Sequence, residues 1–176
     1  MYLKNVASII LIFVWAQSSF SVEKNNHKKR LAPVVVETII NDTTIDDVWD
    51  ILIDFDNYEY MNDWVKIEGE ARVGEVVKVS TIKGSTTLLL EITSIVATGN
   101  VREICWDDVT WFTKYGLDGW RCRTIESLPD RNAVKLTNHF EYTGIFGGVL
   151  AFFTRNVLKE GMTLENTSLK KIIESN

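Results

Sequence analysis

The segment from residue 149 to residue 174 is the feature that most constrains the fold of this chain. It contains no proline, and its apolar residues recur at helical spacing. A helix of this length gains little stability from propensity alone, so its apolar face must pack against another surface. The preceding residues read as short strands, and we therefore expect the helix to pack on a sheet.

The buried face of this helix can be predicted from its apolar residues. We expect it to follow Leu150, Phe153, Val157, Gly161, Leu164 and Ile172, widened by Leu158, Met162 and Leu169. Gly161 is informative because glycine inside a helix costs about 1 kcal/mol relative to alanine. Either its missing side chain leaves room for a ligand, or the helix packs closely on a bulky residue of the sheet.

Segments with a period of two occupy the middle of the chain. Turns rich in glycine, asparagine, aspartate and proline separate them, as is typical of strands joined by tight turns. The predicted strands cover residues 31–41, 65–67, 76–82, 86–97, 101–111, 119–128 and 133–142. Short strands in such a series predict one antiparallel sheet, and with the helices an α+β fold.

Residues 43–64 connect the first strand to the rest of the sheet. Thr43 or Thr44 can cap a helix, with Asp46 or Asp47 completing a capping box. The buried face of that helix is predicted to contain Ile45, Val48, Trp49 and Leu52. Asp56 or Asn57 can then start a second short helix, before Trp64 opens the next strand.

Length and composition indicate one globular domain. The chain has 176 residues, of which 45% are hydrophobic and 24% charged. The net charge is −5 and there is no long basic face, so a nucleic-acid partner is not expected.

The first thirty residues are expected to lie outside this domain. Residues 1–21 have a short basic start, an apolar run and small residues before a cut after Ser21, as in a secretory signal peptide. An uncleaved signal anchor or an interfacial helix is the alternative. Residues 22–30 are a basic linker or a propeptide ending at Lys28-Lys29-Arg30.

Cys105 and Cys122 are the two cysteines of the chain. In a secreted protein an even pair favours a disulfide, and a hairpin turning near Thr113 would place them opposite each other. The alternative is two buried thiols. The sequence contains no zinc-type Cys/His spacing, so no metal is expected. Asn41 and Asn166 begin glycosylation sequons.

The element order and several motifs resemble the START-like, helix-grip superfamily (SRPBCC), in particular its polyketide cyclase/dehydrase-like branch. The resemblance spans residues 34–174. It rests on TIDDVW and LIDFDNY at residues 44–49 and 52–58, on Trp64, on ICW at 104–106, on TNHFEYTG at 137–144 and on NTSLKKIIE at 166–174.

This resemblance implies that a curved antiparallel sheet wraps around the long C-terminal helix, with two short helices after the first strand. The domain would cover residues 31–176 and hold an apolar cavity between sheet and helix. Members of the superfamily bind lipids, sterols, polyketides or hormones, and some catalyse cyclisation or dehydration. Fold alone does not choose among these activities.

Candidate ligand-binding residues follow from the aromatic content and strand alternation. They are Trp64, Trp106, Trp120, Asn138, Phe140, Tyr142, Phe153, Val157 and Gly161. Alternation places Asn138, Phe140 and Tyr142 on one face and His139 on the other. If the first face meets the helix, Asn138 can orient a ligand carbonyl or hydroxyl; otherwise it is a surface residue. The candidates for a catalytic group are Asn138, Tyr142 and His139.

Arg121 and Arg123 share one face of a predicted strand. The pair either binds an anionic head group or balances acidic neighbours on a solvated face.

Together these patterns predict a secreted, monomeric protein that binds a hydrophobic small molecule such as a lipid, sterol or polyketide. No cofactor and no membrane span after signal cleavage are expected. The alternative is a polyketide or terpenoid cyclase or dehydratase that uses the same cavity. A third interpretation, a protein-binding module, would require an exposed apolar groove.

Overall fold

The structure, a computed structural model, describes residues 33–57, 65–81, 87–109, 118–143 and 147–175. Several predictions fall on the remaining residues and therefore lie outside the described part of the chain. They concern the signal peptide (1–21), the basic linker (22–30), most of the second short helix, Trp64 and the hairpin turn near Thr113.

Seven antiparallel strands form one sheet in the order β1-β7-β6-β5-β4-β3-β2. They are β1 (Val34–Asn41), β2 (Val65–Glu68), β3 (Val76–Thr81), β4 (Thr87–Thr98), β5 (Val101–Asp108), β6 (Asp118–Leu128) and β7 (Ala133–Thr143). The predicted antiparallel sheet is confirmed. Each predicted strand end that falls on a described residue lies within three residues of the end of the observed strand.

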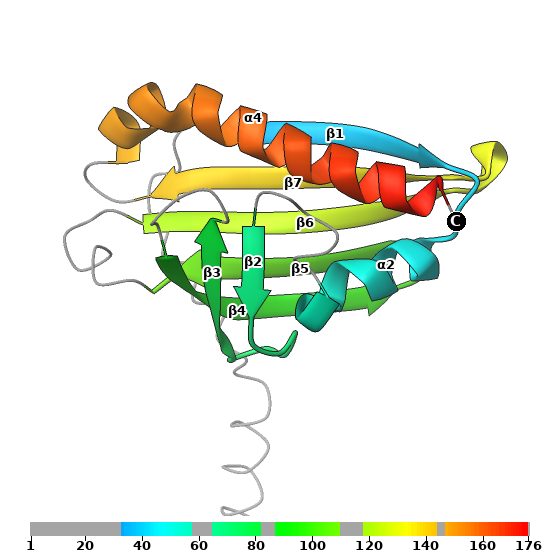
Figure 1. Ribbon diagram of the computed structural model, residues 1–176, viewed down its shortest axis with the longest axis horizontal. Helices are drawn as coiled ribbons and strands as arrows, with labels where there is room; N and C mark the ends of the chain where they lie inside the picture. The colour runs from blue at the N-terminus through cyan, green and yellow to red at the C-terminus, as the bar shows by residue number, and fades with distance from the viewer. Residues whose placement is uncertain (1–32, 58–64, 82–86, 110–117, 144–146, 176) are drawn as a thin grey trace, which may run out of the picture.

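The sheet is strongly curved. Figure 1 shows β2 and β3 running across the direction of β5, β6 and β7 in front of the sheet. The pairing of β4 with β5 shifts register between Ile92 and Ser94. Such a bulge bends a strand and increases its twist, which helps to curl this end of the sheet.

Helix α2 (Ile45–Ile53) begins with the capping box expected from the sequence. The backbone N–H of Asp47 donates to Thr44 Oγ1 at 3.2 Å, and the backbone N–H of Thr44 donates to Asp47 Oδ2 at 3.2 Å. The cap residue is thus Thr44. A 3-10 turn, η1 (Phe55–Asn57), follows and begins one residue earlier than predicted.

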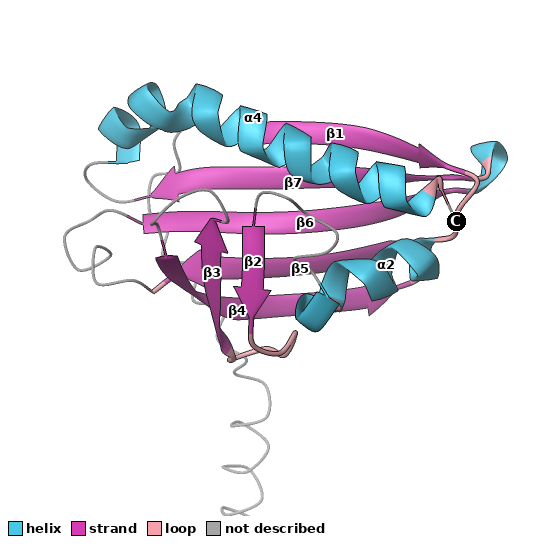
Figure 2. Ribbon diagram, viewed as in Figure 1, coloured by secondary structure: helices cyan, strands magenta, loops and turns pink. Residues whose placement is uncertain are grey.

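Helix α4 (Gly147–Ile173) lies along β1 and β7 (Figures 1 and 2), which confirms that the long helix packs on the sheet. Its C-terminal end is fixed to β1 by polar contacts. Lys170 Nζ donates to the Ile39 carbonyl at 2.8 Å, and the Asn41 backbone N–H donates to Glu174 Oε1 at 3.0 Å. Among the described residues, no helix combines the length and apolar content that a membrane span requires.

The buried face of α4 differs from the predicted one. Among its residues whose burial the structure describes, Gly147, Gly161, Met162, Glu165, Asn166 and Leu169 are buried. Phe153, Val157 and Leu164, which were expected to be buried, have exposed side chains. The prediction was wrong because the helix carries apolar residues on more than one side, and the sheet covers the side that also contains two polar residues.

The hydrophobic core lies between the curved sheet, α2 and the C-terminal half of α4. We call the side of the sheet that α2 and α4 cover the inner face and the opposite side the outer face. The core residues are Ile40, Val48, Trp49, Leu52, Phe55, Val65, Ile67, Val77, Leu90, Ile92, Ile104, Trp106, Ile125, Val134, Leu136 and Leu169.

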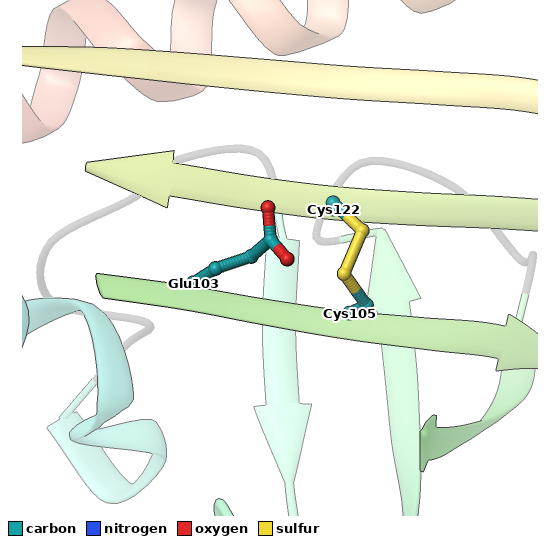
Figure 3. Close-up of side chains that lie close together, drawn as sticks. All are labelled: Glu103, Cys105 and Cys122. Carbon is teal, nitrogen blue, oxygen red and sulfur yellow. A yellow bond between two sulfur atoms is a disulfide. The ribbon is translucent and has the colours of Figure 1, made fainter. Parts of the chain in front are cut away.

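A disulfide joins Cys105 of β5 to Cys122 of β6. The two residues are direct partners in the strand register, as the sequence suggested. Figure 3 shows the bond bridging the two strands with the Glu103 carboxylate beside it. Glu103 accepts a hydrogen bond from Thr124 Oγ1 at 2.8 Å.

Candidate functional site

Strand register decides which side chains of β5, β6 and β7 share a face, because directly opposed residues project to the same side. One inner-face row contains Trp106, Arg121 and Phe140, and the next contains Ile104, Arg123 and Asn138. The outer-face row between them contains Cys105, Cys122 and His139.

A cluster of polar side chains lies between the inner face and α4. We call it the inner-face polar cluster; its members are Arg121, Arg123, Asn138, Glu165 and Asn166. Arg123, Asn138, Glu165 and Asn166 are buried, and the Arg121 side chain is 15% exposed. Charged residues are rarely buried unless they are paired, so this cluster needs an explanation beyond packing.

Glu165 is the centre of the cluster. Its carboxylate accepts hydrogen bonds from the Nη2 atoms of both Arg121 and Arg123. Asn138 Nδ2 also donates to Glu165 Oε2 at 3.2 Å. These charge-assisted bonds satisfy the buried carboxylate and hold α4 against β6 and β7.

The two asparagines extend the cluster to neighbouring strands. Arg121 Nε donates to Asn138 Oδ1 at 2.8 Å, and Asn138 Nδ2 lies 3.5 Å from Asn166 Oδ1. Asn166 Nδ2 in turn donates to Thr38 Oγ1 of β1 at 3.2 Å. Strands β1, β6 and β7 and helix α4 are therefore linked through one polar network.

Trp106 lies beneath both guanidinium groups. Arg121 Cζ is 5.5 Å and Arg123 Cζ is 5.1 Å from the centroid of its ring. Cations at this distance from an indole face are attracted by its negative quadrupole. The buried Trp106 thus stabilises the guanidinium groups of Arg121 and Arg123 and places an apolar ring against them.

An aromatic wall adjoins the cluster along β7. The rings of Phe140 and Tyr142 meet edge to face with centroids 4.8 Å apart. Gly119 of β6 leaves room for the first ring, since a Cβ atom there would lie 2.9 Å from Phe140 Cζ. Burial raises the pKa of the Tyr142 phenol, although its hydrogen bond with Thr154 of α4 partly opposes the rise.

Asn138 shares one face with Phe140 and Tyr142, as alternation predicted, and of the two alternatives left open by the sequence the structure shows the one in which this face meets the helix. However, its side chain already bonds to Arg121, Glu165 and Asn166. Among the described members of the cluster, Arg121 is the cation that is partly exposed.

Trp120 is a correction to the predicted ligand-binding set. It pairs in register with Asp107 and Glu141, which places it on the outer face, opposite to Trp106 and Asn138. There it meets the His139 ring edge to face at 5.4 Å, and His139 Nε2 is 2.9 Å from Glu141 Oε1. The outer-face position of His139 agrees with the strand alternation, so it is remote from the inner-face polar cluster.

The remaining predicted site residues are distributed along α4. Gly161 is buried within the helix, whereas Phe153 and Val157 project into solvent and are not grouped with the inner-face residues.

The Asn166 sequon requires a second correction. Its side chain is 2% exposed and bonded to Thr38, so the folded protein cannot carry a glycan there, whereas Asn41 is exposed.

The sequence analysis did not identify Glu165 as a site residue. For Arg121 and Arg123 it left two interpretations open, a site for an anionic head group and a solvated face. A signal for Glu165 was present, because it falls on the same helical side as Leu158, Met162 and Leu169. An acidic residue within an apolar helical stripe, facing two arginines on a central strand, indicates a buried ion pair.

Among the described residues, Glu103, Cys105 and Cys122 have ligand atoms within 4.8 Å of one another. The metal ligand formed by cysteine is the thiolate, and here both sulfur atoms are joined in the disulfide. We therefore assign no metal site to this group.

Comparison with solved structures identifies the architecture. A hypothetical protein from Helicobacter pylori, jhp0584, superposes with a TM-score of 0.68 at 14% identity, over 80% of this chain and 87% of that one. Norcoclaurine synthase from Thalictrum flavum superposes with a TM-score of 0.62 at 9% identity, over 83% of this chain and 96% of that one. The chain has the helix-grip fold.

A third structure with this fold belongs to a biosynthetic pathway. The di-domain ARO/CYC protein StfQ from the steffimycin biosynthetic pathway superposes with a TM-score of 0.58 at 15% identity. The match covers 81% of this chain and 51% of StfQ. No family model and no curated protein sequence matches the chain. The predicted START-like, helix-grip architecture is thus confirmed at the level of fold.

Proposed function

We propose that this chain is a secreted protein that binds a hydrophobic small molecule between the inner face of the sheet and α4. The inner-face polar cluster carries this proposal. Small-molecule sites are mostly apolar and contain a few polar groups that orient the ligand. Trp106, Phe140 and Tyr142 supply apolar surface, and Arg121 supplies a partly exposed cation among them.

Arg121 indicates the kind of molecule that would fit. Glu165 and Asn138 hold its guanidinium in a fixed position. A ligand carboxylate or carbonyl oxygen can form a charge-assisted hydrogen bond with such a group. We therefore expect a flat or aliphatic molecule with one oxygen-bearing end, in the class of lipids, sterols or polyketides. A structure of norcoclaurine synthase with dopamine and hydroxybenzaldehyde supports the view that this fold can hold small aromatic molecules.

Secretion is proposed from the sequence of residues 1–21 and from the cysteine pair. Disulfides persist in oxidising compartments, such as the extracellular space or the bacterial periplasm. The disulfide between Cys105 and Cys122 agrees with such a location. The mature protein would then consist of the helix-grip domain at residues 31–176, with or without the basic linker at residues 22–30.

Displacement of a fluorescent probe tests the binding site. Delipidated protein should bind 8-anilinonaphthalene-1-sulfonate saturably at one site, and a fatty acid, sterol or aromatic polyketide should displace it. Because Lys lacks the planar fork of Arg, Arg121→Lys should weaken probe binding roughly tenfold. The matched control is Arg131→Lys, on the exposed 3-10 turn η3 (Pro129–Arg131).

The probe also binds disordered proteins, so each variant must first show a cooperative thermal transition. Equal affinities for the parent protein, Arg121→Lys and Arg131→Lys would contradict the proposed site. Absence of saturable binding in the folded parent would contradict the function itself.

A cyclase or dehydratase acting on a polyketide or terpenoid is the second candidate function. It is favoured by the Tyr142 hydroxyl, which lies beside α4 on the inner face with a raised pKa. A phenol that stays neutral can donate a hydrogen bond to a substrate carbonyl as negative charge develops there. Asn138 is less suited to this role because its amide is engaged within the cluster.

Removal of the Tyr142 hydroxyl distinguishes a carrier from a cyclase or dehydratase. Tyr142→Phe should leave probe binding nearly unchanged in a carrier. In an enzyme it should lower turnover of a linear poly-β-ketone by roughly 100-fold, as loss of one oxyanion-type donor does. Equal turnover by the parent and Tyr142→Phe would remove the catalytic assignment of this residue.

A further inference from the structure

The hydroxyl groups of Tyr142 and Thr154 form a second polar point on the inner face. Tyr142 projects from β7 and Thr154 from the N-terminal half of α4, and their side-chain oxygens are hydrogen bonded to each other. Both residues are half-buried. A hydroxyl group has one donor hydrogen and two acceptor lone pairs, so each oxygen can bond to more than one partner. We call these two residues the hydroxyl pair.

The hydroxyl pair and the Arg121 guanidinium lie on opposite sides of Phe140. Arg121 is the partner of Phe140 in the strand register, and its Nε donates to Asn138, two residues before Phe140 on β7. Tyr142 is two residues after Phe140 on the same strand and on the same face. The Phe140 ring therefore separates two polar points of different chemistry.

The contacts with α4 show that this separation is large. Arg121 bonds to Glu165, whereas Tyr142 bonds to Thr154, eleven residues earlier in the same helix. Eleven residues correspond to roughly 16 Å along a helix axis. A ligand that reaches both points must be elongated, and its middle must be apolar because it lies along Phe140.

The two points also differ in charge. Arg121 is a cation, whereas Asp108 of β5 lies at the other end of the site. Asp108 is the next inner-face residue after Trp106, and continuing the register of β5 and β6 places it in the row of Tyr142. A carboxylate there disfavours an anionic ligand group by like-charge repulsion, whereas a neutral hydroxyl is compatible with it.

We propose that the site takes an elongated molecule with an oxygen function at each end. A carboxylate or carbonyl oxygen bonds to Arg121, and a hydroxyl at the far end bonds to the hydroxyl pair. This inference rests on the proposed binding function and narrows its ligands to hydroxy acids and hydroxy ketones with an apolar body. Thr154, on the helix, is then a specificity-determining residue for the far hydroxyl.

Thr154→Val tests this assignment, because it removes the hydroxyl and nearly preserves the shape of the side chain. The matched control is Thr163→Val, at an exposed position of the same helix where the hydroxyl donates to the Lys159 carbonyl at 2.7 Å. Two ligand pairs differ only in the far hydroxyl: 12-hydroxydodecanoic acid with dodecanoic acid, and 6-hydroxy-2-naphthoic acid with 2-naphthoic acid. Each ligand competes with 8-anilinonaphthalene-1-sulfonate.

The quantity compared is the hydroxyl advantage, the affinity for the hydroxylated ligand divided by that for its partner in the same protein. For at least one pair it should fall roughly five- to tenfold in Thr154→Val, as loss of one or two hydrogen bonds implies. Tyr142→Phe should give the same fall, and Thr154→Ser should restore the parent value. Thr163→Val should match the parent.

Arg121→Lys gives the reciprocal result. It should weaken both members of a pair alike and leave the hydroxyl advantage within about twofold of the parent value, because the two ends bind at separate points. An advantage that disappears in Arg121→Lys and persists in Thr154→Val would place the ligand hydroxyl at Arg121 and overturn the inference.

The inference and the proposed function fail in different ways. If the folded parent binds the probe and the acids displace it, but the hydroxyl advantage is equal in the parent, Thr154→Val and Tyr142→Phe, the binding function stands and the inference is overturned. If the folded parent binds no probe, both are overturned.

Discussion

Glu165 of the C-terminal helix forms an ion pair with Arg123 of β6, and both side chains are almost completely buried. The helix therefore meets the sheet through a buried charged contact, which Asn138 and Asn166 extend into a polar network. Arg121 joins the same carboxylate, and Trp106 lies against both guanidinium groups. This contact fixes the position of α4 and brings Arg121 next to the aromatic wall of β7.

The first prediction concerns removal of the charge at the centre of this contact. Glu165→Gln should lower the free energy of unfolding by about 3–5 kcal/mol, because it leaves buried guanidinium groups without their carboxylate. Urea denaturation at neutral pH measures this loss. Glu160→Gln, at an exposed position of the same helix, should change stability by less than about 0.5 kcal/mol. Similar values for the two variants would contradict the structural role of Glu165.

The second prediction concerns the disulfide. The bond closes a loop with a sequence separation of 17, so its loss should lower the free energy of unfolding by about 3 kcal/mol. The effect can be measured by comparing denaturation with and without a thiol reductant. A variant with both Cys105→Ala and Cys122→Ala should be insensitive to the reductant. A parent protein whose stability is also insensitive would show that the bond makes no contribution.

The third prediction tests the close approach of Gly119 to Phe140. Gly119→Ala should cost about 1–3 kcal/mol, because the new methyl group overpacks the aromatic wall. Combining it with Phe140→Leu should cost less than the sum of the two single changes, since the smaller side chain makes room. Thermal denaturation of the four proteins gives this coupling. Strict additivity would show that the two residues do not restrict each other.

The fourth prediction concerns Tyr142 and pH. Because burial raises its pKa, the folded protein holds the phenolic proton more tightly than the unfolded chain. This contribution to stability is fully present below the ordinary tyrosine pKa of about 10 and is lost as pH rises from there through the folded-state pKa. Spectrophotometric titration should show one tyrosine ionising at a higher pH than the others. The late step should be absent from Tyr142→Phe; its persistence there would assign it to another tyrosine.

The sequence predicted the sheet and the first helix well, because their signals are local. Thr44 and Asp47 form the capping box, and alternation placed Asn138 with Phe140 and Tyr142. The cysteines were expected opposite each other from the spacing of a hairpin, and they are partners in the register. These features depend on neighbouring residues in the chain or on one pair of adjacent strands.

The candidate site was predicted less well because it depends on which side of a helix meets the sheet. Phe153 and Val157 were expected to be buried on the strength of their apolar side chains, whereas Glu165 is buried because two arginines of β6 neutralise its charge. Trp120 was grouped with Trp106 by residue type, although their register positions place them on opposite faces. The contacts of Glu165 join it to residues 42 and 44 positions away in the chain, and periodicity within one segment does not determine them.

Native mass spectrometry of the secreted protein tests the central claim most directly. We expect a chain that begins after residue 21 or residue 30, with the two-hydrogen mass loss of the disulfide and one small molecule retained per chain. After delipidation the protein should take up one equivalent of a lipid, sterol or aromatic polyketide, and Arg121→Lys should take up less of it. A folded protein that carries no small molecule and takes up none of these three classes would contradict the account.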